Sequence, residues 1–186
     1  MSDDMGSPSE LVIDFVNTYD VEGETDSIPS PAALTAWLGR RELIGPGDAA
    51  DERDLAAAVD LREALREALR HNHDRPGSGD HGPGPSRPFA DLPLRVALTP
   101  AGPVLEPVAT GVPGGLAGIV AAVMRAHSEG MWPRLKVCTE STCQWAFVDS
   151  SKNRSRSWCS MRVCGNRTKT RAYRARRQTE PGSRHL

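Results

Sequence analysis

The chain has 186 residues, with 23 basic and 24 acidic side chains and a formal net charge of −1. This length allows one ordinary domain and a small module, but not two full-sized domains. No apolar run approaches the roughly 18 residues of a membrane-spanning helix, and the amino terminus MSDDMGSPSE lacks the basic and apolar regions of a signal peptide. We therefore expect a cytoplasmic protein that is not integral to a membrane.

The near-zero net charge hides two parts of opposite sign. Residues 1–131 hold 10 Arg, no Lys and 21 acidic residues, a net charge of −11, whereas residues 132–186 hold 13 basic and 3 acidic residues, a net charge of +10. All four cysteines also lie in the basic part. The sequence therefore predicts an acidic body over residues 1–131, a basic module over residues 132–178 and a disordered tail over residues 179–186.

Hydrophobic spacing and capping residues predict the first two helices of the body. Apolar residues at helical spacing indicate a helix over residues 9–19, with Ser9 as its N-cap. Ser30 followed by Pro31 is typical of a helix start. This second helix should end near Gly39 or at the Gly-Pro pair six residues later.

A longer helix is predicted over residues 51–71, because leucines and valine recur on one side of it. The opposite side is charged and should face solvent, with oppositely charged side chains paired at i, i+4 spacing. This predicted solvent face carries Arg62, Glu63, Arg66, Glu67 and Arg70.

The rest of the body combines a loop, a hairpin and a helix. Residues 75–88 are too rich in Gly and Pro for a regular element and predict a flexible loop. Alternation over residues 94–98 and 104–108 predicts a β-hairpin whose prolines confine the second strand to an edge. A helix over residues 116–127 should start after Gly114-Gly115. Its inward residues should be Leu116, Ile119, Val120, Val123 and Met124.

The cysteines follow the spacing Cys138-x4-Cys143-x15-Cys159-x4-Cys164. Two pairs of thiolates separated by a short excursion suit tetrahedral Zn²⁺ in a closed, structural site. Disulfides are an alternative that a cytoplasmic location disfavours. An iron–sulfur cluster is another, although neither pair has the x2 spacing of ferredoxins. Zn²⁺ with four cysteine ligands is the preferred interpretation.

Aromatic residues accompany the cysteines at Trp132, Trp145, Phe147 and Trp158. A segment of about thirty residues cannot build a core without help. We therefore expect these rings to pack around the metal, with stacking on nucleobases as the alternative.

A basic helix is predicted after the last cysteine, starting at Asn166. Gly165 can take the positive φ that lets the chain leave a metal turn. At 100° per residue, one side of the helix carries Arg167, Arg171 and Arg174, and the opposite side carries Lys169 and Arg176. The helix has no wide apolar stripe, so it requires an anionic partner or solvent around it.

The stretch CQWAFVDSSKNRSRSWCSMRVCGNR, residues 143–167, resembles the CGNR zinc finger family, whose name stands here as Cys164-Gly165-Asn166-Arg167. The stretch IDFVNT, residues 13–18, is similar to the start of the ABATE domain that usually precedes this finger. The resemblance implies a bacterial cytoplasmic protein, a stress-induced transcription regulator whose finger binds DNA, with ligands at all four cysteines. Relatives often have another helix where this chain has the loop at residues 75–88. The loop therefore argues against a ligand-sensing pocket in the body.

Other polar residues do not form a recognisable catalytic site. Asp14 and Asn17 are better explained as caps or buried hydrogen-bond partners than as pocket residues. His71 and His73 are two positions apart and would not share a helical face, which disfavours a second metal site. No nucleophile–base pair and no phosphate-binding glycine loop is present, so we do not expect an enzyme.

Together these features predict an α+β protein, with a mainly helical body that contains a β-hairpin and a small four-cysteine zinc finger that ends in a basic helix. The preferred function is a transcription regulator that binds double-stranded DNA and forms a homodimer through its amino-terminal domain. The predicted DNA contacts are Arg154, Arg156, Arg167, Lys169, Arg171 and Arg174. The alternatives are a module that docks on acidic protein surfaces, including its own body, and an RNA-binding module.

Overall fold

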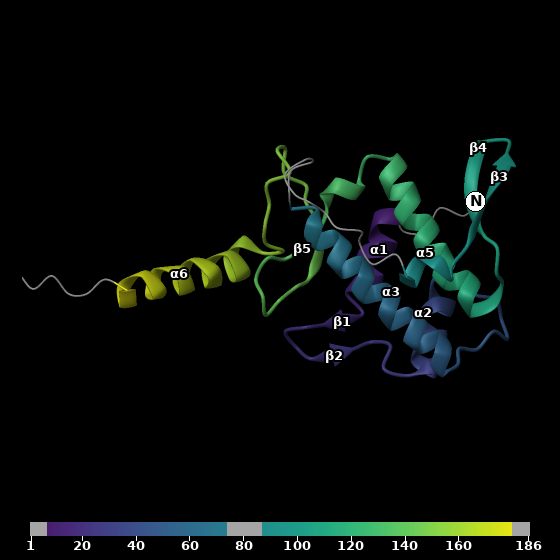
Figure 1. The fold of residues 1–186 in the computed structure, drawn as a ribbon, viewed down its shortest axis with the longest axis horizontal. Helices are drawn as coiled ribbons and strands as arrows, with labels where there is room; N and C mark the ends of the chain where they lie inside the picture. The colour runs from purple at the N-terminus through teal and green to yellow at the C-terminus, as the bar shows by residue number, and fades with distance from the viewer. Residues whose placement is uncertain (1–6, 74–86, 180–186) are drawn as a thin grey trace, which may run out of the picture.

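In the computed structural model, the described residues are 7–73 and 87–179 (Figure 1). They form the predicted mixed α+β fold, with a helical body, three antiparallel strand pairs, a cysteine cluster and a terminal helix. The helices are α1 (Pro8–Val16), α2 (Pro31–Arg40), α3 (Glu52–His71), α4 (Arg87–Ala90), α5 (Gly111–Ser128) and α6 (Asn166–Thr179), with a 3-10 turn at Trp132–Arg134 and a π-helical turn at Met161–Gly165.

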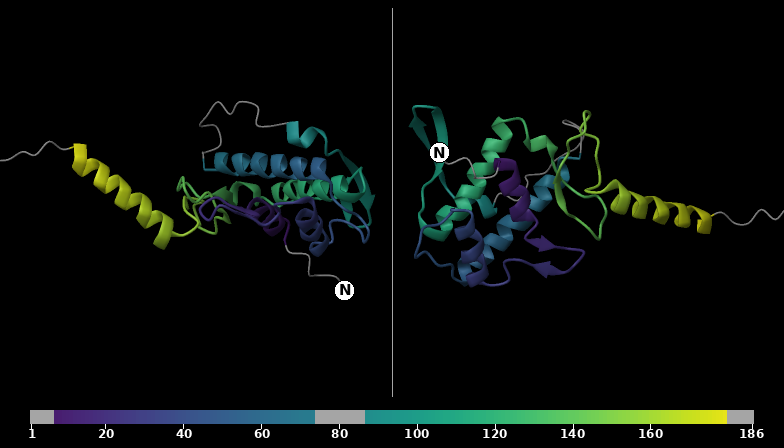
Figure 2. Two further views of the ribbon diagram at one scale, coloured as in Figure 1. Left: turned by 90° about the horizontal axis from the view of Figure 1, so that it is seen from below. Right: turned by 180° about the vertical axis from the view of Figure 1, so that it is seen from behind.

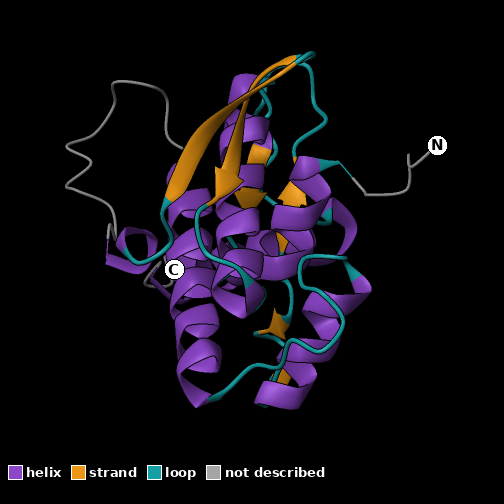
Figure 3. Cartoon of the chain, turned by 90° about the vertical axis from the view of Figure 1, so that its right-hand side faces the viewer, coloured by secondary structure: helices purple, strands orange, loops and turns teal. Residues whose placement is uncertain are grey.

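The strands form three separate antiparallel pairs: β1 (Tyr19–Asp20) with β2 (Thr25–Asp26), β3 (Leu94–Thr99) with β4 (Gly102–Pro107), and β5 (Leu135–Val137) with β6 (Ala146–Val148). The β3–β4 pair confirms the predicted hairpin. It lies at the outer surface of the helical body (Figure 3) and at the opposite end of the molecule from α6 (Figure 2). Of the predicted loop over residues 75–88, residues 75–86 lie outside the described residues, and the last two residues begin α4.

Helix α1 starts at Pro8, one residue before the predicted range, and ends at Val16, three residues before its predicted end. Its N-cap is Ser7 rather than Ser9, because Ser7 and Glu10 form a reciprocal capping box. The Ser7 hydroxyl accepts from the Glu10 amide at 3.2 Å, and the Glu10 carboxylate accepts from the Ser7 amide at 2.8 Å. Pro8 then occupies the first helical turn, where a missing N–H costs nothing.

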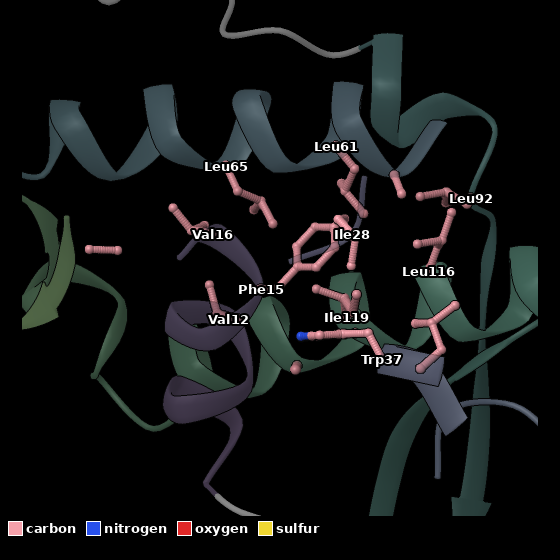
Figure 4. Packing of buried hydrophobic residues seen from close by; sticks show 14 of the residues in the cluster. Val12, Phe15, Val16, Ile28, Trp37, Leu61, Leu65, Leu92, Leu116 and Ile119 are labelled. Atoms are coloured by element: carbon pink, nitrogen blue, oxygen red, sulfur yellow. The ribbon is translucent and has the colours of Figure 1, made fainter. Parts of the chain in front are cut away.

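The core surrounds α1, which packs against both α3 and α5. The Phe15 ring of α1 lies 5.4 Å from the Trp37 ring, measured between centroids. The side chains of Leu61 and Leu65 project from α3 toward Phe15 (Figure 4). All of these side chains are buried, so the predicted apolar faces of the first three helices are confirmed.

The predicted solvent face of α3 is wrong at two arginines. Arg62 and Arg66 are only 4% and 3% exposed. The Arg66 guanidinium donates to the carbonyls of Val16 and Tyr19 at 2.7 and 3.1 Å. Val16 is the last residue of α1, so Arg66 places a cation at the carbonyl end of that helix. Periodicity alone marks an arginine as polar and cannot reveal such partners, because they lie about 50 residues away in the chain.

Helix α5 starts at Gly111, five residues before the predicted start, and Gly114-Gly115 lies inside the helix. A Cβ atom at Gly114 would lie 2.5 Å from the Ala109 carbonyl oxygen, and one at Gly115 would lie 3.0 Å from the Leu43 carbonyl oxygen. The glycines therefore permit close packing rather than mark a boundary. Met124, which we expected to face inward, is 45% exposed.

This packing predicts opposite effects for two glycine substitutions in α5. Gly114→Ala should lower the free energy of unfolding by about 1–3 kcal/mol, because the added methyl group meets fixed backbone. Gly118→Ala is the matched control: its Cβ would lie 3.4 Å from the flexible end of Leu43, and the higher helix propensity should raise stability by up to about 1 kcal/mol. Urea unfolding of both variants checks this, and equal stabilities would contradict it.

Candidate metal centre and basic helix

The structure brings the four predicted cysteines together. Cys138 follows β5, Cys143 precedes β6, and Cys159 and Cys164 lie before and within the π-helical turn. Their Sγ atoms all lie within 4.8 Å of one another. The Cys143–Cys159 and Cys159–Cys164 distances are 3.6 and 3.7 Å.

These distances suit a tetrahedral metal site better than disulfides. Four sulfurs bonded at about 2.3 Å to one Zn²⁺ lie about 3.8 Å apart along each edge of the tetrahedron, whereas the sulfurs of a disulfide are about 2.05 Å apart. All four cysteines are free. Burial raises the pKa of the Cys159 thiol and raises that of Cys164 to about 12, so a metal ion would displace protons from these two ligands.

Local backbone geometry places each cysteine pair. In the first pair, the Glu140 carbonyl accepts from the Cys143 amide at 2.9 Å and turns the chain back. In the second pair, Gly165 does not adopt the positive φ that the sequence suggested. A Cβ atom there would lie 2.5 Å from the Met161 sulfur, so the absence of a side chain lets Met161 pack closely over the π-helical turn.

A buried ion pair organises the excursion between the cysteine pairs. Asp149 is 0% exposed and Lys136 is 2% exposed, and Lys136 Nζ donates to Asp149 Oδ2 at 2.8 Å. The Asp149 carboxylate also accepts from Ser151 and from the Arg156 amide. Burial alone would raise the pKa of Asp149, but these hydrogen bonds outweigh it and hold the pKa well below its usual range.

Two of the four aromatic residues pack as predicted beside the cysteines. Phe147 is 8% exposed and packs with the cysteine cluster, and Trp158 is partly buried against it. Trp132 instead packs against the core of the body, and Trp145 is 39% exposed.

The hairpin β5–β6 joins this module to the helical body. Leu135, Val137 and Ala146 belong to the main hydrophobic core. Asn17, at the end of α1, donates to the Ala146 carbonyl at 3.0 Å and accepts from the Ala146 amide at 2.8 Å. Asn17 therefore acts as a hydrogen-bond partner, the interpretation that the sequence favoured, but its partner lies 129 residues away.

Three further side chains of α3 and its end bind the same module. Arg66 donates to the Gln144 carbonyl at 2.9 Å. The Asn72 amide donates to the carbonyls of Trp132 and Leu135, both at 2.8 Å. His73 contacts the Val137 carbonyl. These contacts fix the cysteine module against the body through its backbone.

The family comparisons divide the chain at the same place as its charge. Residues 9–128 match the ABATE model, described as a putative stress-induced transcription regulator, and residues 134–177 match the CGNR zinc finger. The chain belongs to the ABATE family. These are regulator and zinc-finger families rather than enzyme families. A search of curated proteins finds no match. Among the described residues, no helix combines the length and apolar character that crossing a bilayer requires.

The CGNR residues connect the cysteine cluster to α6. After Cys164 and the closely packed Gly165, the Asn166 side chain donates to the Arg162 carbonyl at 3.0 Å. Arg167 donates to Glu22 of the ABATE domain at 2.7 Å and to Thr142 at 3.3 Å. The motif therefore contacts both the finger and the ABATE domain at the start of α6.

Glu140 holds the next turn of α6, a role that the sequence analysis missed. Its side chain is 1% exposed. It accepts from the Thr168 hydroxyl at 2.8 Å and pairs with Arg171 at 3.0 Å. The hydrogen bond from Thr168, opposed by burial and aided by Arg171, lowers the pKa of Glu140. The sequence gives one indication of this role. Glu140 lies between two cysteines and is one of only three acidic residues in the basic part of the chain, where arginine partners are plentiful.

The six predicted DNA-contacting residues fall into different settings. Arg167, Arg171 and Arg174 lie together on one face of α6 and line a shallow hollow with Thr170 and Ala175. Lys169 and Arg154 are exposed elsewhere.

Arg156 is turned inward within the finger. It donates to the carbonyls of Trp158 and Cys159 and lies 5.0 Å from the Phe147 ring centroid. Arg156 therefore supports the fold of the finger instead of presenting its guanidinium to solvent.

The Asp149–Lys136 pair should be essential to the stability of the finger. Asp149→Ala should lower the free energy of unfolding by about 3–5 kcal/mol, because it leaves a buried cation without its partner. Since the pKa of Asp149 is lowered on folding, its contribution is complete above the ordinary carboxyl pKa of about 3.9 and is lost as pH falls below that value.

The control is the double variant Lys136→Met with Asp149→Leu, which removes both charges and should be closer to the wild type in stability. Urea unfolding at pH 7 measures all three proteins. A single variant within about 0.5 kcal/mol of the wild type would contradict the assignment.

Proposed function

We propose that this protein is a DNA-binding transcription regulator in which one structural Zn²⁺ positions α6 against DNA. The observation that carries the proposal is the direct connection between two features. Four sulfurs at the spacing of a tetrahedral zinc site lie immediately before an exposed arginine-rich helix. Cys138, Cys143, Cys159 and Cys164 would be the ligands.

Zinc in this site would have a structural role. A Zn²⁺ ion with four thiolate ligands has no open coordination position, so it supplies folding energy and not a reactive centre. Around it, the residues of this chain set the direction of α6. Cys164 lies in the last turn before the helix, Glu140 holds Thr168 and Arg171, and Glu22 holds Arg167. The helix would therefore be presented as a rigid surface.

The charge and exposure of α6 support a polyanion as its partner. Residues 166–179 include six basic residues and no acidic residue. The side chains of residues 169–177 are exposed, and the helix extends away from the acidic body (Figure 2). An α-helix fits the major groove of B-DNA. The acidic body would repel phosphates and so restrict contact to α6.

The extended position of α6 also favours an accessible helix over one docked on its own body. Arg167, in the first turn, forms the ion pair with the ABATE domain, through Glu22. Arg174, two turns further along, is exposed. Phosphate contacts by Arg167, Lys169, Arg171 and Arg174 would position the helix, and any of these side chains that reach base edges would specify sequence.

Metal analysis tests the zinc proposal. The purified protein should contain one Zn²⁺ per chain, and Cys159→Ser should lose the metal and the folded finger, because three ligands do not close the site. Ser155→Ala, a change at an exposed serine of the same segment, is the control and should retain the metal. Elemental analysis with circular dichroism gives both readouts. A metal-free wild type with a fully folded finger would contradict the assignment.

A duplex-binding titration tests the DNA proposal. With about four to six phosphates neutralised, log K should fall against log salt with a slope of about −4 to −5. Arg174→Ala should weaken binding and reduce the magnitude of the slope by about 1. The control is Arg125→Ala, which removes an exposed arginine of α5 in the ABATE domain. A slope near zero would exclude phosphate contacts, and stronger binding to hairpin RNA at the same salt would favour RNA instead.

A further inference from the structure

The β3–β4 hairpin exposes apolar side chains that nothing in the described chain covers. Val96 is 69% exposed and Leu98 is 86% exposed. Both lie on β3 with side chains on the same face, since alternate residues of a strand point the same way. A two-stranded hairpin is marginal by itself in water. Here β4 packs against α5, which leaves β3 on the outside.

The two edges of this hairpin differ in their capacity to pair with another strand. The register aligns Leu94 with Pro107, Val96 with Leu105 and Leu98 with Pro103. The Val108 amide donates to the Pro93 carbonyl at 3.1 Å, which marks that pair as hydrogen-bonded. In an antiparallel ladder hydrogen-bonded and non-hydrogen-bonded pairs alternate, so the three aligned pairs direct their backbone polar groups outward.

Prolines block one of these outer edges and leave the other open. On β4, two of the three outward positions are Pro103 and Pro107, which have no N–H to donate. On β3 the outward positions are Leu94, Val96 and Leu98, and each has an N–H and a carbonyl. In the described part of the chain, β3 pairs only with β4. An open edge of this kind is a template for a further strand.

We propose that the free edge of β3 joins two copies of this chain into a dimer. The two β3 strands would pair antiparallel about a twofold axis at Val96. Val96 would face Val96 of the second copy, and Leu94 would face Leu98 of that copy. In this register every outward N–H meets an outward carbonyl, so the pairing makes a four-stranded sheet in the order β4, β3, β3, β4.

Three properties of β3 favour a second copy over an unrelated peptide. The edge is self-complementary, as a twofold interface requires. In the proposed register Arg95 faces Ala97 of the other copy, so no like charges oppose each other, and Arg95 already pairs with Glu106 at 3.1 Å within its own hairpin. The prolines of β4 prevent further strand addition, so the assembly closes at two copies.

The dimer leaves the basic helices free. The hairpin and α6 lie at opposite ends of the molecule in every view (Figures 1 and 2). Pairing through β3 therefore covers neither α6 nor the cysteine cluster. The inference is independent of DNA binding and of zinc, and its test needs only the mass of the protein in solution.

Sedimentation equilibrium of the full chain over a range of concentrations tests the proposal. The wild type should convert from a 20.1 kDa monomer to a dimer as concentration rises, because a single strand seam is a small interface. Val96→Pro should raise the dimer dissociation constant about 30-fold, since it removes one N–H donor from each copy at the twofold axis. The substitution breaks no hydrogen bond to β4, because the Val96 N–H points away from β4.

A second pair of variants decides the case if proline disturbs the hairpin. Val96→Lys places like charges opposite each other across the axis and should abolish the dimer. Val104→Lys puts the same charge on β4, on the other face of the hairpin, and should leave the dimer intact. A wild type that is monomeric at every concentration would overturn the proposal. So would equal effects of the two lysine variants in proteins with unchanged circular dichroism and melting temperature.

Discussion

The convergence of four cysteine sulfurs is the constraint on which the carboxy-terminal third of this protein depends. The segment from Arg134 to Gly165 has few apolar residues, and Phe147 is the only large one buried beside the cysteines among the described residues. Hydrophobic burial on this scale cannot order about thirty residues. The two chain reversals bring the four sulfurs together, and α6 starts directly after the second reversal.

The finger is nevertheless not an independent unit attached by a linker. Its hairpin contributes Leu135, Val137 and Ala146 to the core of the ABATE domain. Asn17 and Arg66 satisfy backbone groups of the finger that would otherwise be buried without partners. The IDFVNT motif thus includes a residue whose hydrogen bonds are made to the finger.

Charge is organised on two scales in this molecule. Over the whole chain, acidic and basic residues are segregated, and residues 169–177 of the basic helix are exposed. At the root of the helix, Glu22 and Glu140 are placed individually to pair with Arg167 and Arg171. These two ion pairs lie in the first turns of α6, and Arg174, further along the helix, is exposed.

The sequence by itself determined the features that depend on local chemistry. Cysteine spacing predicted the cluster, Ser30-Pro31 predicted the start of α2, and alternation predicted the β3–β4 hairpin, because each signal lies within a few residues of its effect. The basic helix was predicted in the same way from Asn166 onward. The capping box of α1 is also a local signal, because Ser7 and Glu10 are three residues apart.

Only the tertiary structure decided the roles that depend on distant partners. Arg62 and Arg66 are charged residues that sequence places in solvent, but the carbonyls and side chains that bury them come from other elements. Gly115 is explained in the same way, by the close approach of Leu43 and Ile44 from a distant segment. A side chain's environment is set by whatever the fold brings beside it, and a local pattern carries no information about that neighbour.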